Sequence, residues 1–117
     1  NGNRVNNNIL TNKTNLMMND LNLQNAKMQL RNEIILAVNN AKLALKRYKA
    51  ANQSLLAQER SLNFAKKSFE AGVLNYYDYN NARLLFLNAQ SQKQSAKFEY
   101  IFRNKIVKFY SKNSWDI

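Results

Sequence analysis

The side chains that could carry out chemistry are few in this sequence and are scattered along it. Its 117 residues include seven Asp and Glu residues but no His and no Cys. Acid–base catalysis needs titratable groups gathered in one concave site, and histidine is the most common base. Ser54, Ser61 and Ser91 lie in polar helical stretches, and none has the glycine-flanked pattern of a catalytic serine. The sequence therefore predicts that the protein is not an enzyme and has no catalytic residues.

Metal and cofactor sites are also not predicted. Without Cys or His, a metal would need clustered carboxylates, and the acids are isolated from one another. No glycine-rich loop that could cradle a phosphate is present, since the only glycines are Gly2 and Gly72. No apolar run approaches the roughly 18 residues of a membrane-spanning helix. We expect no metal, no cofactor and no membrane helix in this segment.

The charge balance is strongly basic. Eighteen Lys and Arg residues give a formal net charge of +11. The densest run is Lys42, Lys46, Arg47 and Lys49, and the other bases recur every few residues, which is typical of a solvated helix face. A basic helical protein that binds nucleic acid is an alternative, and its affinity would fall steeply with salt. Because the bases are scattered and no nucleic-acid motif is present, we predict no nucleic-acid partner.

The elements that position these residues are two helices. Proline is absent and Gly72 is the only internal strong breaker, so nothing else forces the backbone to turn. We expect one helical-hairpin segment over residues 1–117, with a long helix over 1–71, a turn over 72–78, a returning helix over 79–111 and a tail over 112–117. An Asn cluster at the start predicts an irregular beginning to the long helix, because Asn is a mediocre helix former.

A seven-residue repeat of apolar side chains runs along the long helix. One series comprises Ile9, Leu16, Leu23, Leu30, Ala37, Ala44, Ala51 and, after the polar Gln58, Ala65. A second series comprises Ile34, Ala41, Tyr48, Leu55, Leu62 and Phe69, and the returning segment has Ala82, Ala89 and Ala96. Apolar rows at this spacing form a coiled-coil seam. The predicted fold class is all-α, a long antiparallel coiled-coil helical hairpin.

Such a hairpin is thin, so it needs partners. A two-helix rod buries one stripe per helix, which is too little surface to be stable alone. The returning helix is about half as long as the first and pairs only with its distal half, so residues 4–35 must pack against something else. The sequence also begins at Asn1 without a signal peptide, and we expect it to be a segment of a longer chain.

The predicted turn is unusually apolar. Gly72 stands where a helix C-terminus favours a left-handed residue, and either Asn75 or Asp78 could cap the second helix. A purely structural turn has no need for Val73, Leu74, Tyr76 and Tyr77 together. These residues either form a docking surface or pack locally, and the sequence leaves both interpretations open.

From Leu30 onward the sequence resembles the C-terminal repeat of TolC-type outer-membrane efflux proteins. The resemblance rests on Phe69-Glu70-Ala71-Gly72, the turn from Val73 to Tyr77, Asp78, the stretch from Ala82 to Phe86, and Ala89-Gln90. Asn1-Gly2 also looks like the loop that leaves the last barrel strand in this family, so the resemblance covers nearly the whole chain.

The resemblance implies a Gram-negative homotrimer with an outer-membrane β-barrel, whose strands this chain lacks, and a periplasmic α-barrel. This chain would be the periplasmic hairpin in a channel of tripartite efflux or type I secretion, a passive conduit opened by untwisting of the hairpin. Gly72, Val73, Leu74 and Asn75 would form the tip that docks a periplasmic adaptor, or membrane fusion protein, linked to an inner-membrane transporter. Asp78 would face the pore constriction.

The sequence departs from the family pattern at the tip and one turn beyond it. Asn81 stands where the family often has a second acid at the constriction, and Leu74 replaces a basic tip residue. A soluble coiled-coil scaffold or adaptor hairpin is the main alternative function, because it has the same periodicity. It differs in pairing by itself, whereas a conduit segment needs the barrel strands to form a trimer.

Overall fold

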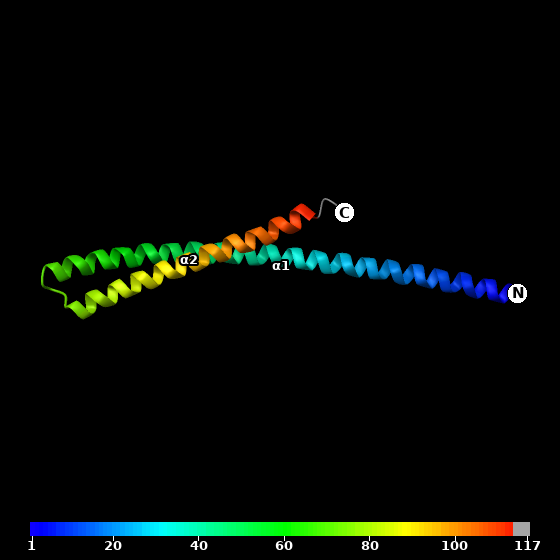
Figure 1. Cartoon of the computed structure of the whole chain (residues 1–117), viewed down its shortest axis with the longest axis horizontal. Helices are drawn as coiled ribbons and strands as arrows, with labels where there is room; N and C mark the ends of the chain where they lie inside the picture. Colours follow the sequence, from blue (N-terminus) through cyan, green and yellow to red (C-terminus); the bar gives the residue numbers. More distant parts are fainter. Residues whose placement is uncertain (114–117) are drawn as a thin grey trace. The chain divides into compact units, whose positions relative to one another are not determined.

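The computed structural model describes residues 1–113, in which two helices are joined by a short turn (Figure 1). Helix α1 spans Gly2–Glu70 and helix α2 spans Tyr76–Asn113, and no strand occurs in this described range. The predicted all-α helical-hairpin fold is therefore confirmed. The chain divides into two compact units, residues 1–36 and residues 37–117.

Residues 1–36 form regular helix from Gly2 onward. The expected irregular start is wrong, because the Asn cluster is helical. Asn is only a few tenths of a kcal/mol worse than most residues in a helix, and adding a residue to an existing helix is easy compared with starting one. Two hydroxyls also bond to the preceding turn, from Thr11 to the carbonyl of Asn7 at 2.8 Å and from Thr14 to the carbonyl of Leu10 at 2.9 Å.

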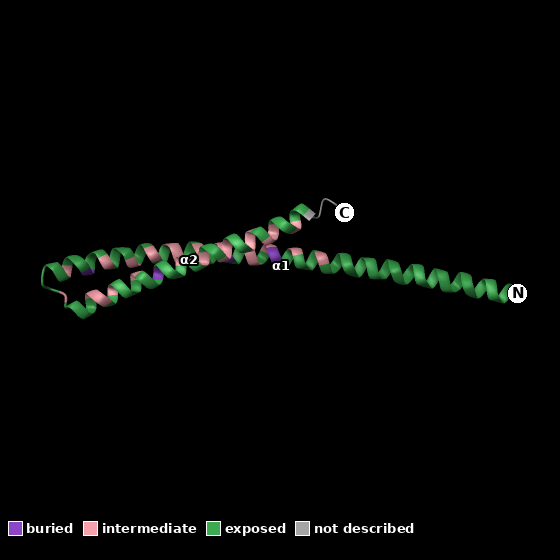
Figure 2. Ribbon diagram, viewed as in Figure 1, coloured by how far each residue is buried: buried purple, intermediate pink, exposed green. Residues whose placement is uncertain are grey.

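Side chains in the first part of this unit are solvent-exposed. Every residue from 1 to 29 is exposed (Figure 2), including Leu16 and Leu23 of the first apolar series. A single helix with an exposed apolar row depends on tertiary packing for most of its stability. Within this unit the described structure is a single helix, so the unit itself supplies no such packing.

In the second unit the distal part of α1 and the returning α2 run side by side in opposite directions (Figure 1). On α2 a row of buried or half-buried residues recurs in alternating steps of three and four along one face. The row comprises Tyr79, Ala82, Phe86, Ala89, Lys93, Ala96, Tyr100, Arg103, Val107 and Tyr110. Asn80, Glu99, Asn104 and Ile106, each next to a member of this row, are also half-buried. This periodicity is the signature of an antiparallel coiled coil.

Two ring stacks fix how the helices of this unit are aligned. Tyr48 stacks on Tyr100 with ring centroids 6.3 Å apart, and Phe69 stacks on Tyr79 with centroids 5.1 Å apart. The two pairs are separated by three heptads on each helix, in opposite directions, so the alignment is constant between them. Between the two stacks, levels with larger side chains therefore alternate with levels that hold alanine on at least one helix.

The small layers hold the most deeply buried side chains. Among the described residues the buried apolar side chains are all alanines, Ala37, Ala44, Ala65 and Ala89, and Ala44 is completely inaccessible. Small side chains let two helix backbones approach closely. The seam is therefore narrow and contains no large buried core residue among those the structure describes.

Candidate functional site

The turn between the helices begins with a well-defined helix end. Gly72 has a φ of 75°, its amide donates to the carbonyl of Phe69 at 3.0 Å, and the amide of Val73 donates to the carbonyl of Ser68 at 2.9 Å. These two bonds form the Schellman motif, which satisfies carbonyls at the end of a helix and needs a left-handed residue. Gly72 is the residue that permits this conformation without strain.

Helix α2 begins with an Asn cap. The side-chain oxygen of Asn75 accepts a hydrogen bond from the amide of Asp78 at 2.8 Å, and its carbonyl accepts the first helical bond from Tyr79. Of the two capping residues that the sequence allowed, Asn75 is the one used. The carboxylate of Asp78 lies in the first turn of α2, where a negative charge is favoured by the helix dipole. Five residues thus reverse the chain between two stabilised helix ends.

Contacts between aromatic rings of the two helices stabilise the turn. Phe69, near the end of α1, stacks on Tyr79 and meets Tyr76 edge-on with ring centroids 6.0 Å apart. Aromatic pairs of this kind contribute about 0.5–1.5 kcal/mol beyond the surface that they bury. The cluster joins the last turn of α1 to the first turn of α2, so the turn is held by the helices on both sides.

The predicted docking residues lie at the surface of this turn. Val73 is 83% exposed, Gly72 and Asn75 are exposed, and Leu74 is half-buried. Tyr77, which is 79% exposed, lies beside them in sequence. Of the two interpretations of the apolar turn, local packing accounts for the half-burial of Leu74, whereas Val73, Tyr76 and Tyr77 present apolar surface to solvent.

The two residues predicted for a pore constriction are both exposed on α2. Asp78 and Asn81 are three residues apart, so they lie on the same side of the helix one turn from each other. Neither side chain forms an ion pair within residues 1–113. A carboxylate and an amide are thus presented together next to the turn, and both are free to face solvent or a neighbouring subunit.

The structure brings the predicted seam residues of the second unit together along the inner sides of the hairpin (Figure 2). Ala37, Ala44, Ala65 and Ala89 are buried, and Phe69 is the most exposed of the set at 38%. The half-buried members are Tyr48, Ala51, Leu55, Leu62, Ala82 and Ala96. Sequence reasoning placed Phe86, Tyr100 and Val107 in the apolar stripe of the returning helix, but it did not identify the seven-residue series that joins them to Tyr79 and Lys93.

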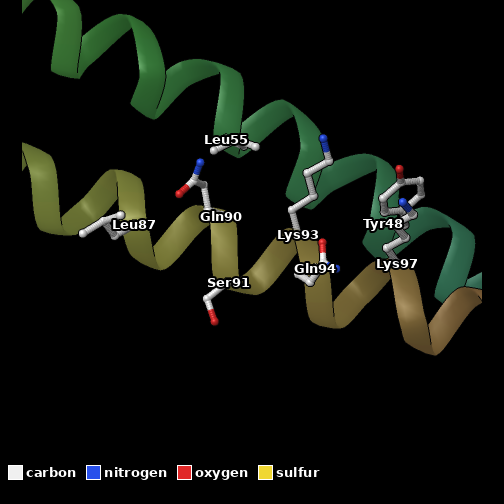
Figure 3. A pocket seen from close by; sticks show the side chains of 8 residues that line it. All are labelled: Tyr48, Leu55, Leu87, Gln90, Ser91, Lys93, Gln94 and Lys97. Carbon is white, nitrogen blue, oxygen red and sulfur yellow. The ribbon is translucent and has the colours of Figure 1, made fainter.

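A hollow along the hairpin was also missed from the sequence. It has a volume of about 530 Å³ and is open to solvent between α1 and α2 (Figure 3). It is lined by Tyr48, Leu55, Leu87, Gln90, Ser91, Lys93, Gln94 and Lys97. The signal that could have revealed it is Lys93, a charged residue in a heptad series that is otherwise apolar and aromatic.

Several kinds of site are not found in the residues that the structure describes. Within 1–113 no three His, Cys, Asp or Glu residues are grouped so that they could hold a metal ion. In the same range, neither helix combines the length and hydropathy needed to cross a bilayer. No buried side-chain nitrogen or oxygen in this range is left without a hydrogen-bond partner.

A helical hairpin with an apolar exposed turn, a narrow alanine seam and an unpartnered helical arm defines a class of proteins that work by assembly. The sequence matches the family described as Outer membrane efflux protein over residues 1–101, and the chain belongs to this family. Neither a curated protein nor a solved structure gave a significant match. Members of this family are channel components associated with the outer membrane rather than enzymes.

Proposed function

We propose that this chain is the periplasmic helical hairpin of a homotrimeric outer-membrane channel, which acts as a passive conduit in tripartite efflux or type I secretion. The observation that carries the proposal is the family match over residues 1–101, combined with a helical hairpin whose turn presents Val73 and Tyr77 to solvent. The conduit performs no chemistry. Its wall guides substrates across the periplasm and the outer membrane.

In this proposal the turn docks a periplasmic adaptor, which links the channel to an inner-membrane transporter. Gly72, Val73, Leu74 and Asn75 form the docking tip, and the rigidity of the two helix ends supports it. An exposed valine beside an exposed tyrosine is the type of apolar surface that proteins usually cover with a partner. A preformed turn loses little conformational freedom when the adaptor binds.

The exposed arm of residues 1–36 also has a role in this assembly. Its apolar row, which includes Ile9, Leu16 and Leu23, packs against other helices of the trimeric α-barrel. The same assembly brings Asp78 and Asn81 of three subunits around the pore axis, where the carboxylates favour cations. Channel opening then requires the hairpin to rotate or slide, which a seam of buried alanines permits without emptying a large core.

The decisive experiment places a charge in the docking tip. In cells that depend on this channel, Val73→Asp should reduce export of a fluorescent efflux substrate by about tenfold, because a carboxylate would be desolvated in the apolar interface. Gln53→Asp, on the exposed side of α1, is the matched control and should leave export unchanged. Trimer abundance in the membrane is measured for both variants, so that loss of docking is separated from loss of assembly.

The soluble scaffold inferred as an alternative makes the opposite prediction. A scaffold would remain in the soluble fraction, and export would be equal in the wild type, in Val73→Asp and in a strain that lacks the protein. Such a result would exclude the channel role altogether. Unchanged export in Val73→Asp alone, with full loss in the deletion strain, would retain the channel but reject the tip as the docking site.

A further inference from the structure

The two flanks of the hairpin differ in charge. Five lysines of the second unit, Lys42, Lys49, Lys93, Lys97 and Lys108, lie on one flank, which we name the basic flank. Lys93 and Lys97 line the large hollow, and Lys42 lines a second hollow of about 190 Å³. Lys49 is one heptad from Lys42, and Lys108 is two heptads from Gln94 of the large hollow, so both share this side.

The other flank is marked by the ion pair between Arg47 and Glu99, whose charged atoms are 3.5 Å apart. Arg47 precedes Lys49 by two residues and Glu99 follows Lys97 by two, which places each pair on opposite sides of its helix at about 100° per residue. In the heptad series of Arg47 and Glu99 the remaining residues of the second unit are neutral except for Asp78. This flank is thus close to neutral.

The lysines of the basic flank are not neutralised within the chain. None of the five forms an ion pair with another residue of the described range 1–113. Two acids lie on this side of the hairpin, Glu70 in the heptad series of Lys49 and Glu59 in that of Leu45. Both lie nearer the turn, where Lys66 and Arg83 lie as well. The basic flank between Lys42 and Lys49 on α1, and between Lys93 and Lys108 on α2, therefore carries uncompensated positive charge.

Apolar side chains lie in both hollows of the basic flank. Tyr48 and Leu55 lie in the larger hollow, whose other lining residues are mostly polar, and Ala41, Leu45 and Val107 lie in the smaller one, which is mainly apolar. Lys93 and Gln90 extend from α2 toward α1 at the larger hollow, whereas Ser91 points away from it (Figure 3). The α1 residues of the two hollows extend from Val38 to Leu55, which is about 25 Å of α1 at 1.5 Å per residue. Two successive hollows that contain apolar side chains and are bordered by lysines have the polarity to accept an amphipathic helix.

We propose that the basic flank is a second docking surface, which binds an acidic amphipathic helix of a partner protein. The apolar side chains of that helix would enter the two hollows, and its carboxylates would pair with Lys93 and Lys97 on the rim. A second copy of this chain does not fit, because its basic flank would bring lysines against lysines and its other flank is nearly neutral. The surface is separate from the turn and does not depend on the turn's proposed role.

The position of Lys93 supports this assignment. It occupies a seam position that is Tyr79, Phe86, Tyr100 or Val107 in the neighbouring heptads, where a charged residue lowers the stability of a coiled coil. Its side chain is half-buried and has no acidic partner in the described range. A carboxylate of the partner protein over the hollow would supply that acidic group. The lysine that destabilises the isolated hairpin would then form a specific contact in the complex.

The test uses the intact purified protein and a labelled synthetic helical peptide of about 18 residues, with leucines along one face and glutamates beside them. The matched probe has glutamine in place of every glutamate. Fluorescence anisotropy should show that the glutamate peptide binds about tenfold more tightly than the glutamine peptide, and that its affinity falls with salt. The double variant Lys93→Gln/Lys97→Gln should bind the glutamate peptide about tenfold more weakly than the wild type.

The control variant is Lys46→Gln/Lys67→Gln, which removes the same charge from exposed positions of α1 that point away from the seam. It should change the affinity less than twofold, and circular dichroism should show equal helicity in both double variants. The proposal would be overturned if the control variant lost as much affinity for the glutamate peptide as Lys93→Gln/Lys97→Gln. It would also be overturned if the wild type bound the glutamine peptide as tightly as the glutamate peptide, or did not bind the glutamate peptide. Equally tight binding of polyphosphate, lost in the same variant, would also overturn it in favour of a general polyanion site.

A Val73→Asp variant separates this proposal from the role of the tip. It should bind the glutamate peptide with wild-type affinity, because Val73 lies outside both hollows. If that variant also exports normally, the tip proposal fails while the basic flank stands. If the variant lost peptide binding while the trimer stayed intact, the peptide would be docking at the turn and the basic-flank proposal would be wrong.

Discussion

At Gly72 the backbone has a φ of 75°, although an added Cβ would meet no atom within 4 Å. The strain of a substitution there would come from the backbone conformation and not from a collision. We expect Gly72→Ala to lower the free energy of unfolding by about 1 kcal/mol. Gly2→Ala is the control, because Gly2 is helical and also surrounded by open space. Thermal unfolding followed by circular dichroism would contradict the assignment if both variants behaved alike.

Asp78 allows a prediction about ion selectivity that depends on the proposed pore. If three carboxylates surround the axis, Asp78→Asn should reduce the ratio of cation to anion permeability by at least about twofold. The reversal potential of the purified channel in a planar bilayer under a KCl gradient measures this ratio. Glu59→Gln removes an acid elsewhere on the hairpin and should have little effect. An equal shift in both variants would show that total charge, and not a ring at the constriction, sets the selectivity.

The turn shows what the sequence could and could not predict about single residues. The need for a left-handed residue at Gly72 follows from its position between two periodic segments. The choice of Asn75 over Asp78 as the cap depends on where the second helix begins, which is Tyr76 and three residues earlier than expected. The half-burial of Leu74 depends on tertiary packing, which local sequence does not encode.

At the scale of the helices, the alanine layers limit side-chain size. Ala44 is completely inaccessible, so Ala44→Leu must push the helices apart or distort a side chain. We expect a loss of about 1–3 kcal/mol in the free energy of unfolding, measured by urea denaturation. Ala57→Leu is the matched control, since Ala57 is exposed on the same helix and should tolerate the larger side chain. Equal stability of the two variants would mean that the seam is wider than described.

At Lys93, the charged position in the seam, a substitution should raise the stability instead of lowering it. Lys93→Leu replaces a half-buried charge with an apolar side chain opposite Leu55, and we expect a gain of about 1 kcal/mol in the free energy of unfolding. Lys46→Leu, at an exposed position of α1, should change the stability by less than about half as much. A loss of stability in Lys93→Leu would show that this lysine already has a favourable environment without a partner.

The helices were easier to predict than their alignment. The heptad spacing in α1 indicated a seam, because helical geometry places residues seven apart on one face. It did not reveal which residues of α2 lie opposite, since alignment depends on contacts such as that between Tyr48 and Tyr100. The basic flank could not be derived for the same reason, because it exists only once Lys42 and Lys97 are placed on one side of the pair.

At the scale of the whole molecule, the two units should differ in stability when the chain is isolated. Residues 4–29 are exposed and have no packing in the described chain, whereas the hairpin has a seam. Amide hydrogen exchange should be fast in residues 4–29 and slower by at least about tenfold around Ala51. In the assembled protein, residues 4–29 should become protected. Equal protection of both regions in the isolated chain would show that the arm needs no partner.

The repeating layers of the seam have a consequence for the reach of the hairpin. Levels with alanine on at least one helix recur every seven residues, and the turn is closed by its own hydrogen bonds and aromatic rings. Inserting or deleting seven residues in both arms at once would therefore restore the same facing pairs on either side of the change. The length of the hairpin can vary in steps of about 10 Å, at 1.5 Å per residue, while the turn stays the same. The distance that such a protein bridges is thus adjustable independently of what its tip binds.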